Sequence, residues 1–359
     1  MAEGGRSAMA GQVPDRQAVR AAARLSVAPM MDWTDRHCRY FHRLMSARTL
    51  LYTEMVTAPA LVRGRALHLL DFDPAEQPVA VQLGGSDPEE LAAAARLAAG
   101  AGYCEVNLNV GCPSDRVQSG AFGAVLMKEP GLVAECVAAM IGAAEGIEVT
   151  VKCRIGVDEQ EPRAILPDFL ARVSEAGVSR FQIHARKAWL RGLSPKENRT
   201  VPPLDHGLVL EMKRAFPHLH VAINGGIGGL EQACGFLEAG LDGVMIGRAA
   251  YERPADILLG ADHAVFGQPV TARTPVDIAQ EMRPHIARHL AAGGRLHDIT
   301  RHMLGLFAGR PGARSWRRLL SEGARRPGAG LEVLDAALEA VTSLSPGQDD
   351  GRAGMAGKE

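Results

Sequence analysis

The sequence predicts a (β/α)8 TIM barrel, an α/β fold, followed by a small C-terminal helical domain. Short apolar runs alternate with Ala- and Leu-rich stretches, and parallel strands that are buried on both faces give such runs. Eight runs in about 230 residues fit one barrel. An open doubly wound sheet is the alternative, but no G-x-G-x-x-G motif follows the first run. The runs begin near Leu25, Thr49, Pro78, Cys104, Glu148, Arg180, His220 and Gly243.

Helical stretches lie between the runs and replace them after residue 260. Between the runs, the apolar pattern predicts helices at 88–101, 131–144, 166–176 and 229–239. In the C-terminal part it predicts helices at 275–292, 296–306, 313–321 and 331–341, separated by turns that contain glycine or proline. We therefore expect a catalytic barrel over 25–265, a helical domain over 270–345, and disordered tails over 1–24 and 346–359.

The composition indicates a cytoplasmic protein with a large core. Apolar residues make up 47% of the 359 residues. No apolar run approaches the roughly 18 residues of a membrane span, and the N-terminus lacks the apolar stretch of a signal peptide. The six cysteines include no C-x-x-C pair and no zinc-ligand spacing, which is typical of reduced thiols. We expect a monomer that binds neither a metal nor a membrane.

The charge is unevenly distributed, although the net charge is only −1. Residues 25–270 hold 23 basic and 29 acidic side chains, whereas residues 271–345 hold 11 basic and 7 acidic ones. An acidic body with a basic appendage favours a polyanionic partner that the appendage holds. The alternative is a solvated, arginine-rich helix face.

Glycine turns at the ends of the last two runs predict a phosphate site. Asn224, Gly225 and Gly226 end the seventh run, and Gly247 and Arg248 end the eighth. Glycine lets backbone N–H groups approach an anion, and barrels often hold a phosphate in the loops after these two strands. Arg248 can add charge-assisted hydrogen bonds. Each turn alone could be ordinary, but the two together favour the phosphate.

Polar side chains at other run ends, with an apolar ledge at 28–31, indicate a flavin mononucleotide (FMN) pocket. Lys152, Gln82 and His184 end the fifth, third and sixth runs. The chain has 34 arginines and six lysines, so a lysine at a strand end suggests a need for a compact ammonium group. A cation there would stabilise the anionic reduced flavin. The alternative is that Gln82 and His184 are structural.

Cys112 lies in a Gly-Cys-Pro turn directly after the fourth run. An ordinary thiol, with a pKa of about 8.5, is mostly protonated near neutral pH and can act as a general acid. No histidine is close enough in sequence to form a Cys/His nucleophile pair, although pairing in space stays open. The alternative is an inert buried cysteine, which we expect of Cys104, Cys136, Cys153 and Cys234.

The long connection after the sixth run predicts contacts with RNA. It contains one aromatic residue and several cations, namely Trp189, Arg191, Lys196 and Arg199. Such a set suits phosphate contact and base stacking, and long loops in compact domains are usually functional or disordered. In the helical domain, Arg314 and Arg317 fall at helical spacing on one face.

Several long segments resemble one family. They are APMMDWTDRHCRYFHR from Ala28, EVNLNVGCPSDRVQSGAFGA from Glu105, VKCRIGVD from Val151, IHARKAWLRGLSPKENR from Ile183, INGGI from Ile223, DGVMIGRAAY from Asp242 and RHMLGLFAGRPGARSWRRLLSE from Arg301. The chain resembles the bacterial tRNA-dihydrouridine synthases over about residues 25–345, most closely their A-type branch.

The resemblance implies FMN, NADPH as the reductant, and reduction of the uridine C5–C6 bond in the tRNA D-loop, at positions 20 and 20a. Hydride would pass from reduced flavin to C6, Cys112 would protonate C5, and the base would have to leave the stack. The residues expected to bind FMN are Pro29, Met30, Met31, Gln82, Lys152, His184, Asn224, Gly225, Gly226, Gly247 and Arg248. The residues expected to meet tRNA are Asn109, Arg186, Lys196, Arg199, Arg314 and Arg317.

Two other functions compete with this one. A flavin barrel that acts on a free pyrimidine, like the dihydroorotate dehydrogenases, would not need the basic helical domain. A tRNA-binding folding helper with a vestigial flavin would not need Cys112 and Lys152, yet both residues are present.

Overall fold

A computed structural model describes residues 14–114 and 121–343 of the chain. The chain divides into two compact units, Met1–Ala272 and Arg273–Glu359. The first unit contains the barrel and the second contains only helices in its described part. Each unit is described by itself below. The expected fold class is confirmed.

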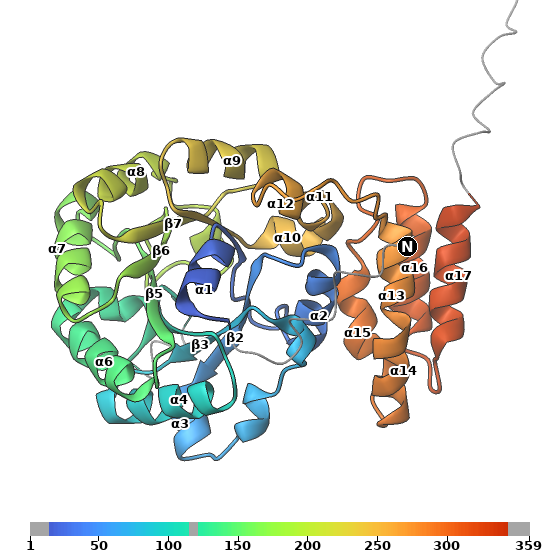
Figure 1. Ribbon diagram of the computed structural model, residues 1–359, viewed down its shortest axis with the longest axis horizontal. Coiled ribbons are helices and arrows are strands. Elements are labelled where there is room, and N and C mark those ends of the chain that lie inside the picture. The colour runs from blue at the N-terminus through green and yellow to red at the C-terminus, as the bar shows by residue number, and fades with distance from the viewer. Residues whose placement is uncertain (1–13, 115–120, 344–359) are drawn as a thin grey trace, which may run out of the picture. The chain divides into compact units, whose positions relative to one another are not determined.

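The barrel closes from eight parallel strands in the order of the chain (Figure 1). The last strand pairs with the first, with Leu25 opposite Val244, so the sheet has no free edge. All eight apolar runs of the sequence form strands. Their bounds are β1 (Leu25–Val27), β2 (Leu50–Thr57), β3 (Val79–Gly84), β4 (Glu105–Val110), β5 (Glu148–Arg154), β6 (Arg180–His184), β7 (His220–Asn224) and β8 (Gly243–Ile246).

Helices cover the outside of the barrel (Figure 1). Aspartates start several of them, because a carboxylate accepts a hydrogen bond from a free N–H of the first turn. Asp87 accepts from Glu90 N at 2.9 Å, and Asp205 accepts from Leu208 N at 2.8 Å. The helices are α1 (Arg16–Ala22), α2 (Arg36–Met45), α3 (Ala58–Val62), α4 (Pro88–Gly100), α6 (Pro130–Ala143), α7 (Pro162–Glu175), α8 (His206–Ala215), α9 (Leu230–Glu238), α10 (Arg248–Glu252), α11 (Pro254–Leu258) and α12 (Ala261–Ala264). Short 3-10 turns are η1 (Leu67–Leu70), η2 (Pro74–Glu76), η3 (Gly123–Lys128) and η4 (Glu197–Arg199).

The N-terminal region departs from the expectation of a disordered tail over 1–24. Residues 16–22 form α1, whose Val19 and Ala22 are buried in the barrel unit. Arg20 pairs with Glu148 at 2.7 Å, although the two residues are 128 positions apart in the sequence. With only two buried side chains, the helix is too short to give a clear apolar period in the sequence. Residues 1–13 and 344–359, the rest of the expected tails, lie outside the described residues.

The N-terminal end of the barrel is filled by a buried polar cluster. Arg180 is fully buried and pairs with Glu105 and, at 3.1 Å, with Glu148. Glu105 also accepts hydrogen bonds from the Tyr52 hydroxyl, at 2.6 Å, and from Thr150. Hydrogen bonds to the remaining polar atoms lower the cost of a buried ion pair, so removal of one member would leave another buried charge without its partner. It lies at the opposite end of the strands from the site described below.

The second unit contains α13 (Pro275–Glu281), α14 (Arg283–Ala291), α15 (Leu296–Met303), α16 (Ala313–Gly323) and α17 (Leu331–Thr342). The single helix expected at 275–292 is divided at Met282, because Pro284 in the next turn cannot donate a backbone hydrogen bond. Trp316 is fully buried, and its Nε1 donates to Met303 O at 2.9 Å. None of the helices in the two described ranges is long and apolar enough to cross a membrane.

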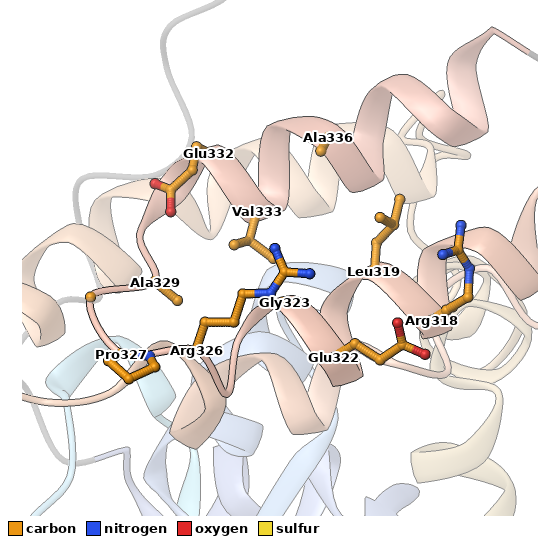
Figure 2. A pocket seen from close by; sticks show the side chains of 11 residues that line it. Arg318, Leu319, Glu322, Gly323, Arg326, Pro327, Ala329, Glu332, Val333 and Ala336 are labelled. Atoms are coloured by element: carbon orange, nitrogen blue, oxygen red, sulfur yellow. The ribbon is translucent and has the colours of Figure 1, made fainter.

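A cavity of about 370 Å³ lies between the end of α16 and the start of α17 (Figure 2). The two helices approach closely there, because a Cβ on Gly323 would lie 2.7 Å from Val333 Cγ1. Neither Arg314 nor Arg317 contributes to the lining, and both are exposed. The lining residues are Arg318, Leu319, Glu322, Gly323, Arg326, Pro327, Gly328, Ala329, Glu332, Val333 and Ala336.

Candidate active site

A cavity of about 730 Å³ opens at the carboxyl ends of the barrel strands. This is the end at which barrel enzymes place their active sites. Arg186 and Lys196 do not line it, and Arg314 and Arg317 belong to the other unit. The predicted residues that line it together are Pro29, Met30, Met31, Gln82, Asn109, Cys112, Lys152, His184, Arg199, Asn224, Gly225, Gly226, Gly247 and Arg248.

The turn after β7 requires its glycines. Gly225 and Gly226 have φ angles of 108° and 73°, in the region that side chains disfavour. A Cβ on Gly226 would lie 2.4 Å from Leu204 Cδ1, and one on Gly225 would lie 3.1 Å from His184 Cε1. The turn therefore brings bare backbone to the cavity wall, which is the arrangement that an anion needs. Gly247 differs, because its Cβ would meet only ordinary contacts, the nearest at 3.6 Å.

Lys152 projects a cation into the cavity from β5. Its flanking residues Val151 and Cys153 are fully buried, as strand alternation requires. Its ammonium group has no hydrogen-bond or ion-pair partner within 14–114 and 121–343. Burial, and then the guanidinium of Arg154, lower the pKa of Lys152 from 10.5 to about 8. The ammonium group is therefore charged at neutral pH, and an anionic ligand would stabilise this buried charge.

His184 ends β6 beside the glycine turn. Burial, followed by Arg154 and Lys152, holds the pKa of His184 well below its ordinary range. The imidazole is therefore neutral and can donate one hydrogen bond and accept another. Its Nδ1 is buried without a partner in the described part of the chain, and so is the Nε of Arg186. Buried polar atoms are normally paired, and because His184 lines the cavity, its Nδ1 is available to a ligand there.

Four arginines, namely Arg154, Arg199, Arg248 and Arg253, line the cavity, and Arg186 is close enough to Arg154 and Arg248 to interact with them electrostatically. Burial lowers the pKa of Arg154 to about 10, and it also lowers those of Arg186 and Arg199. Mutual repulsion adds to this, because Arg248 lowers the pKa of both Arg186 and Arg199. Arg248 and Arg199 are also linked directly, since Arg248 Nη2 donates to Arg199 O at 3.4 Å. Such a concentration of positive charge favours a polyanion.

A chain of amide side chains sets the position of Cys112. Asn109 Oδ1 accepts from the backbone N–H groups of Gly111 and Cys112, at 3.0 and 2.9 Å. Asn109 Nδ2 donates to Gln82 Oε1 at 2.8 Å, and Gln82 Nε2 donates to Asn107 Oδ1 at 2.7 Å. The turn that carries the thiol is thus fixed from inside the barrel. Cys112 is itself partly exposed, and its Sγ lies 3.5 Å from Ser114 Oγ.

These bonds bear on two expected roles. Gln82 is only 1% exposed and Asn109 only 8%, and neighbouring amides or backbone groups already bond both ends of each amide. The bonds of Gln82 to FMN and of Asn109 to tRNA stay predictions. Their partners here show a positioning role that the sequence did not suggest.

The loop after β6 is organised around a buried asparagine. Asn198 is fully buried, and its amide accepts from Trp189 N at 2.7 Å and donates to Trp189 O at 2.9 Å. The Lys187 ammonium lies 5.3 Å from the centre of the Trp189 ring. The cations of the loop, Lys196 and Arg199, therefore extend from an ordered segment. Their contacts with tRNA stay a prediction.

Arg154 was missed by the sequence reasoning although a signal existed. It follows Lys152 by two positions, so strand alternation places both on the same face. Asn198 could not be predicted in this way, because a buried asparagine in a loop belongs to no periodic pattern of the sequence. Trp33, which also lines the cavity, stacks on Tyr251 with ring centres 4.4 Å apart. That stack joins residues more than 200 positions apart and could not be read from the sequence.

A TIM barrel whose mouth combines a partly exposed thiol, an ammonium group without a partner among the described residues, and a glycine turn is of the kind that enzymes use to bind an anionic ligand. The family model for dihydrouridine synthase matches residues 26–342. The chain belongs to the dihydrouridine synthase family.

Curated relatives resemble the chain over most of its length. The tRNA-dihydrouridine(20/20a) synthase of Vibrio cholerae is 57% identical over 321 residues, which cover 89% of this chain and 97% of that protein. The protein of the same name from Escherichia coli K12 is 55% identical over 330 residues, covering 92% and 94%. The one from Shewanella oneidensis is 56% identical over 316 residues, covering 88% and 93%.

Proposed function

We propose that this protein reduces the C5–C6 double bond of uridine in the tRNA D-loop to dihydrouridine, with FMN as the bound flavin and NADPH as the reductant. The observation that carries the proposal is the single cavity in which Cys112, Lys152 and the glycine turn after β7 come together. Membership of the dihydrouridine synthase family supports it. The names of the relatives extend it to positions 20 and 20a.

The residues of the cavity fit FMN. Gly225 and Gly226, whose conformation excludes side chains, would hold the phosphate together with Arg248. His184, whose Nδ1 has no partner among the described residues, and the ammonium of Lys152 would bond the ring. When bound, the flavin supplies the hydride that adds to uracil C6. Lys152 would stabilise the negative charge of the reduced ring.

Cys112 would supply the proton. Hydride addition at C6 breaks the C5–C6 π bond and leaves negative charge on C5 and O4. The Cys112 S–H bond then breaks, a C5–H bond forms, and the thiolate recovers its proton from water. The position of the thiol supports this role, because it is partly exposed in the cavity whereas Cys104, Cys136 and Cys153 are buried.

Cations would hold the tRNA. Arg186, Lys196 and Arg199 lie at or beside the loop after β6, and Arg314 and Arg317 are exposed on α16. Phosphate contacts supply most of the affinity for a nucleic acid, and the target base has to be flipped out to enter a cavity of this kind.

Mass mapping of dihydrouridine in tRNA tests the proposal. Purified protein with FMN and NADPH is given unmodified tRNA or free uridine, and the products are located by nuclease digestion and mass spectrometry. We expect dihydrouridine at positions 20 and 20a and none from free uridine. Turnover of free uridine at a similar rate would favour a free-pyrimidine enzyme. Bound tRNA without any dihydrouridine would favour the folding helper.

A further inference from the structure

We infer that Arg154 is a positioning residue. It joins the turn that carries Cys112 (residues 111–114) to the loop after β6 (residues 187–199), so that the two segments are ordered as one unit. The inference rests on the proposed role of Cys112 and goes beyond it. Arg154 is only 4% exposed, and it lines the cavity between the two segments that it joins.

The guanidinium group donates to three backbone carbonyls. Nε donates to Gly111 O at 2.9 Å, in the turn directly before the thiol. Nη1 donates to Lys187 O at 2.9 Å and to Asn198 O at 3.0 Å, at the two ends of the loop segment 187–198. A planar guanidinium can bridge such points at fixed angles, whereas an ammonium cannot. Both segments therefore depend on one side chain of β5.

The packing supports the same conclusion. A Cβ on Gly111 would lie 3.5 Å from Arg154 Cγ, so the arginine stem lies directly against the turn. On the loop side, the accepting carbonyl of Asn198 belongs to the residue whose buried amide organises the loop. A displacement of Arg154 would thus move both the turn and the centre of the loop. In addition, the thiol of Cys112 and the guanidinium of Arg154 are close enough to interact electrostatically.

The consequence is a link between binding and chemistry. The loop carries Lys196 and Arg199, which are expected to meet tRNA, and the turn carries the proton donor. Contact of tRNA with the loop would tighten the hydrogen bonds of Arg154 and fix the thiol at the same time. Loss of the bridge would lower kcat through a misplaced thiol and raise KM through a looser loop.

Arg43 offers a matched control. It is a partly buried arginine whose guanidinium, among the described residues, donates only to backbone carbonyls, those of Ser46, Thr49, Glu76 and Pro78. Burial likewise lowers its pKa to about 10. None of its acceptors lines the cavity, so Arg43→Lys reports what a purely structural arginine costs.

The test compares Arg154→Lys with Arg43→Lys by hydrogen exchange and by kinetics. In Arg154→Lys we expect amides in both 111–114 and 187–199 to exchange about 10- to 100-fold faster, as the loss of charge-assisted hydrogen bonds implies. We also expect kcat for dihydrouridine formation to fall by about 10- to 100-fold, with a raised KM for tRNA. In Arg43→Lys neither segment and neither constant should change.

Two outcomes would overturn the inference: exchange that changes in one segment only, or in neither. If Arg154→Lys does not fold, exchange in the wild-type protein over a denaturant series decides instead. The two segments should then open with the same free energy, and separate openings would contradict the link. Full activity in Cys112→Ala would remove the proposed role of the thiol, but the exchange result would still stand or fall separately.

Discussion

Replacement of Lys152 by methionine should make the flavin-free barrel more stable at neutral pH. The ammonium has no partner among the described residues, and burial lowers its pKa from 10.5 to about 8. Methionine has a similar length and volume and carries no charge, so it removes the cost of burial without leaving a cavity. If the loss of Lys152 makes the fold more stable, the lysine is present to bind a ligand and not to stabilise the barrel.

The size and the sign of the effect follow from the pKa. The fall from 10.5 to about 8 corresponds to roughly 3 kcal/mol at neutral pH, and we expect about 1–3 kcal/mol because the side chain is partly open to the cavity. The folded-state pKa is the lower one, so the folded chain binds the proton more weakly. The cost is complete below about pH 8, shrinks as the pH rises to 10.5, and disappears above it.

Urea unfolding of the flavin-free proteins measures the difference. Lys152→Met should be more stable than the wild type at pH 7, and the gap should close near pH 10.5. Lys213→Met is the control, because Lys213 pairs with Asp242 at 2.7 Å and donates to Leu219 O at 2.8 Å, so its loss should destabilise. A variant less stable than the wild type at pH 7, or a gap that does not depend on pH, would refute the reasoning.

Three further predictions concern the remaining parts of the site. Cys112→Ala should keep the flavin and its reduction by NADPH, but the rate of dihydrouridine formation should fall by about 10²–10⁴-fold. Cys153→Ala, which removes a buried thiol, is the control and should change this rate little. Single-turnover assays separate flavin reduction from dihydrouridine formation. Gly226→Ala should weaken FMN binding at least about tenfold in a fluorescence titration, because φ is 73° and the new Cβ would clash; unchanged affinity would exclude this turn as the phosphate site. Arg314→Ala with Arg317→Ala should reduce the slope of log K for tRNA against log salt by roughly 0.7–0.9 for each lost contact, and an unchanged slope would mean a merely solvated face.

The barrel could be predicted because strands buried on both faces leave a direct trace in the sequence. The cavity residues Lys152, His184 and Gly226 could be predicted for a related reason, since the carboxyl ends of parallel strands meet at one rim. The bonds of Gln82 and Asn109 could not. They depend on the register that places Gln82 opposite Asn107 on the neighbouring strand, and a sequence does not state its register.

The helices also divide into those that the sequence predicts and those that it does not. The period of 3.6 residues locates α4 and α6 because each is 13 residues or longer and buries at least four side chains on one face. It fails for α1, which is held by distant groups such as Glu148 and not by its own pattern. Local patterns therefore predict elements that are stabilised by many similar contacts, whereas elements held by one or two distant contacts have to be seen in the structure.

The positive charge at the barrel mouth affects the binding of both ligands that we propose, FMN and tRNA. Arg248 lowers the pKa of both Arg186 and Arg199, and Arg154 lowers the pKa of Lys152. An anion that binds one of these groups reduces the repulsion among the cations. A second anion is then attracted less strongly than the first, but cations remain available to bind it. The flavin phosphate, beside Arg248, and the tRNA backbone, beside Arg199, would thus share one field. A barrel that is destabilised by its own charges when empty gains stability when the ligands bind, so the folded enzyme is favoured most where cofactor and tRNA are both present.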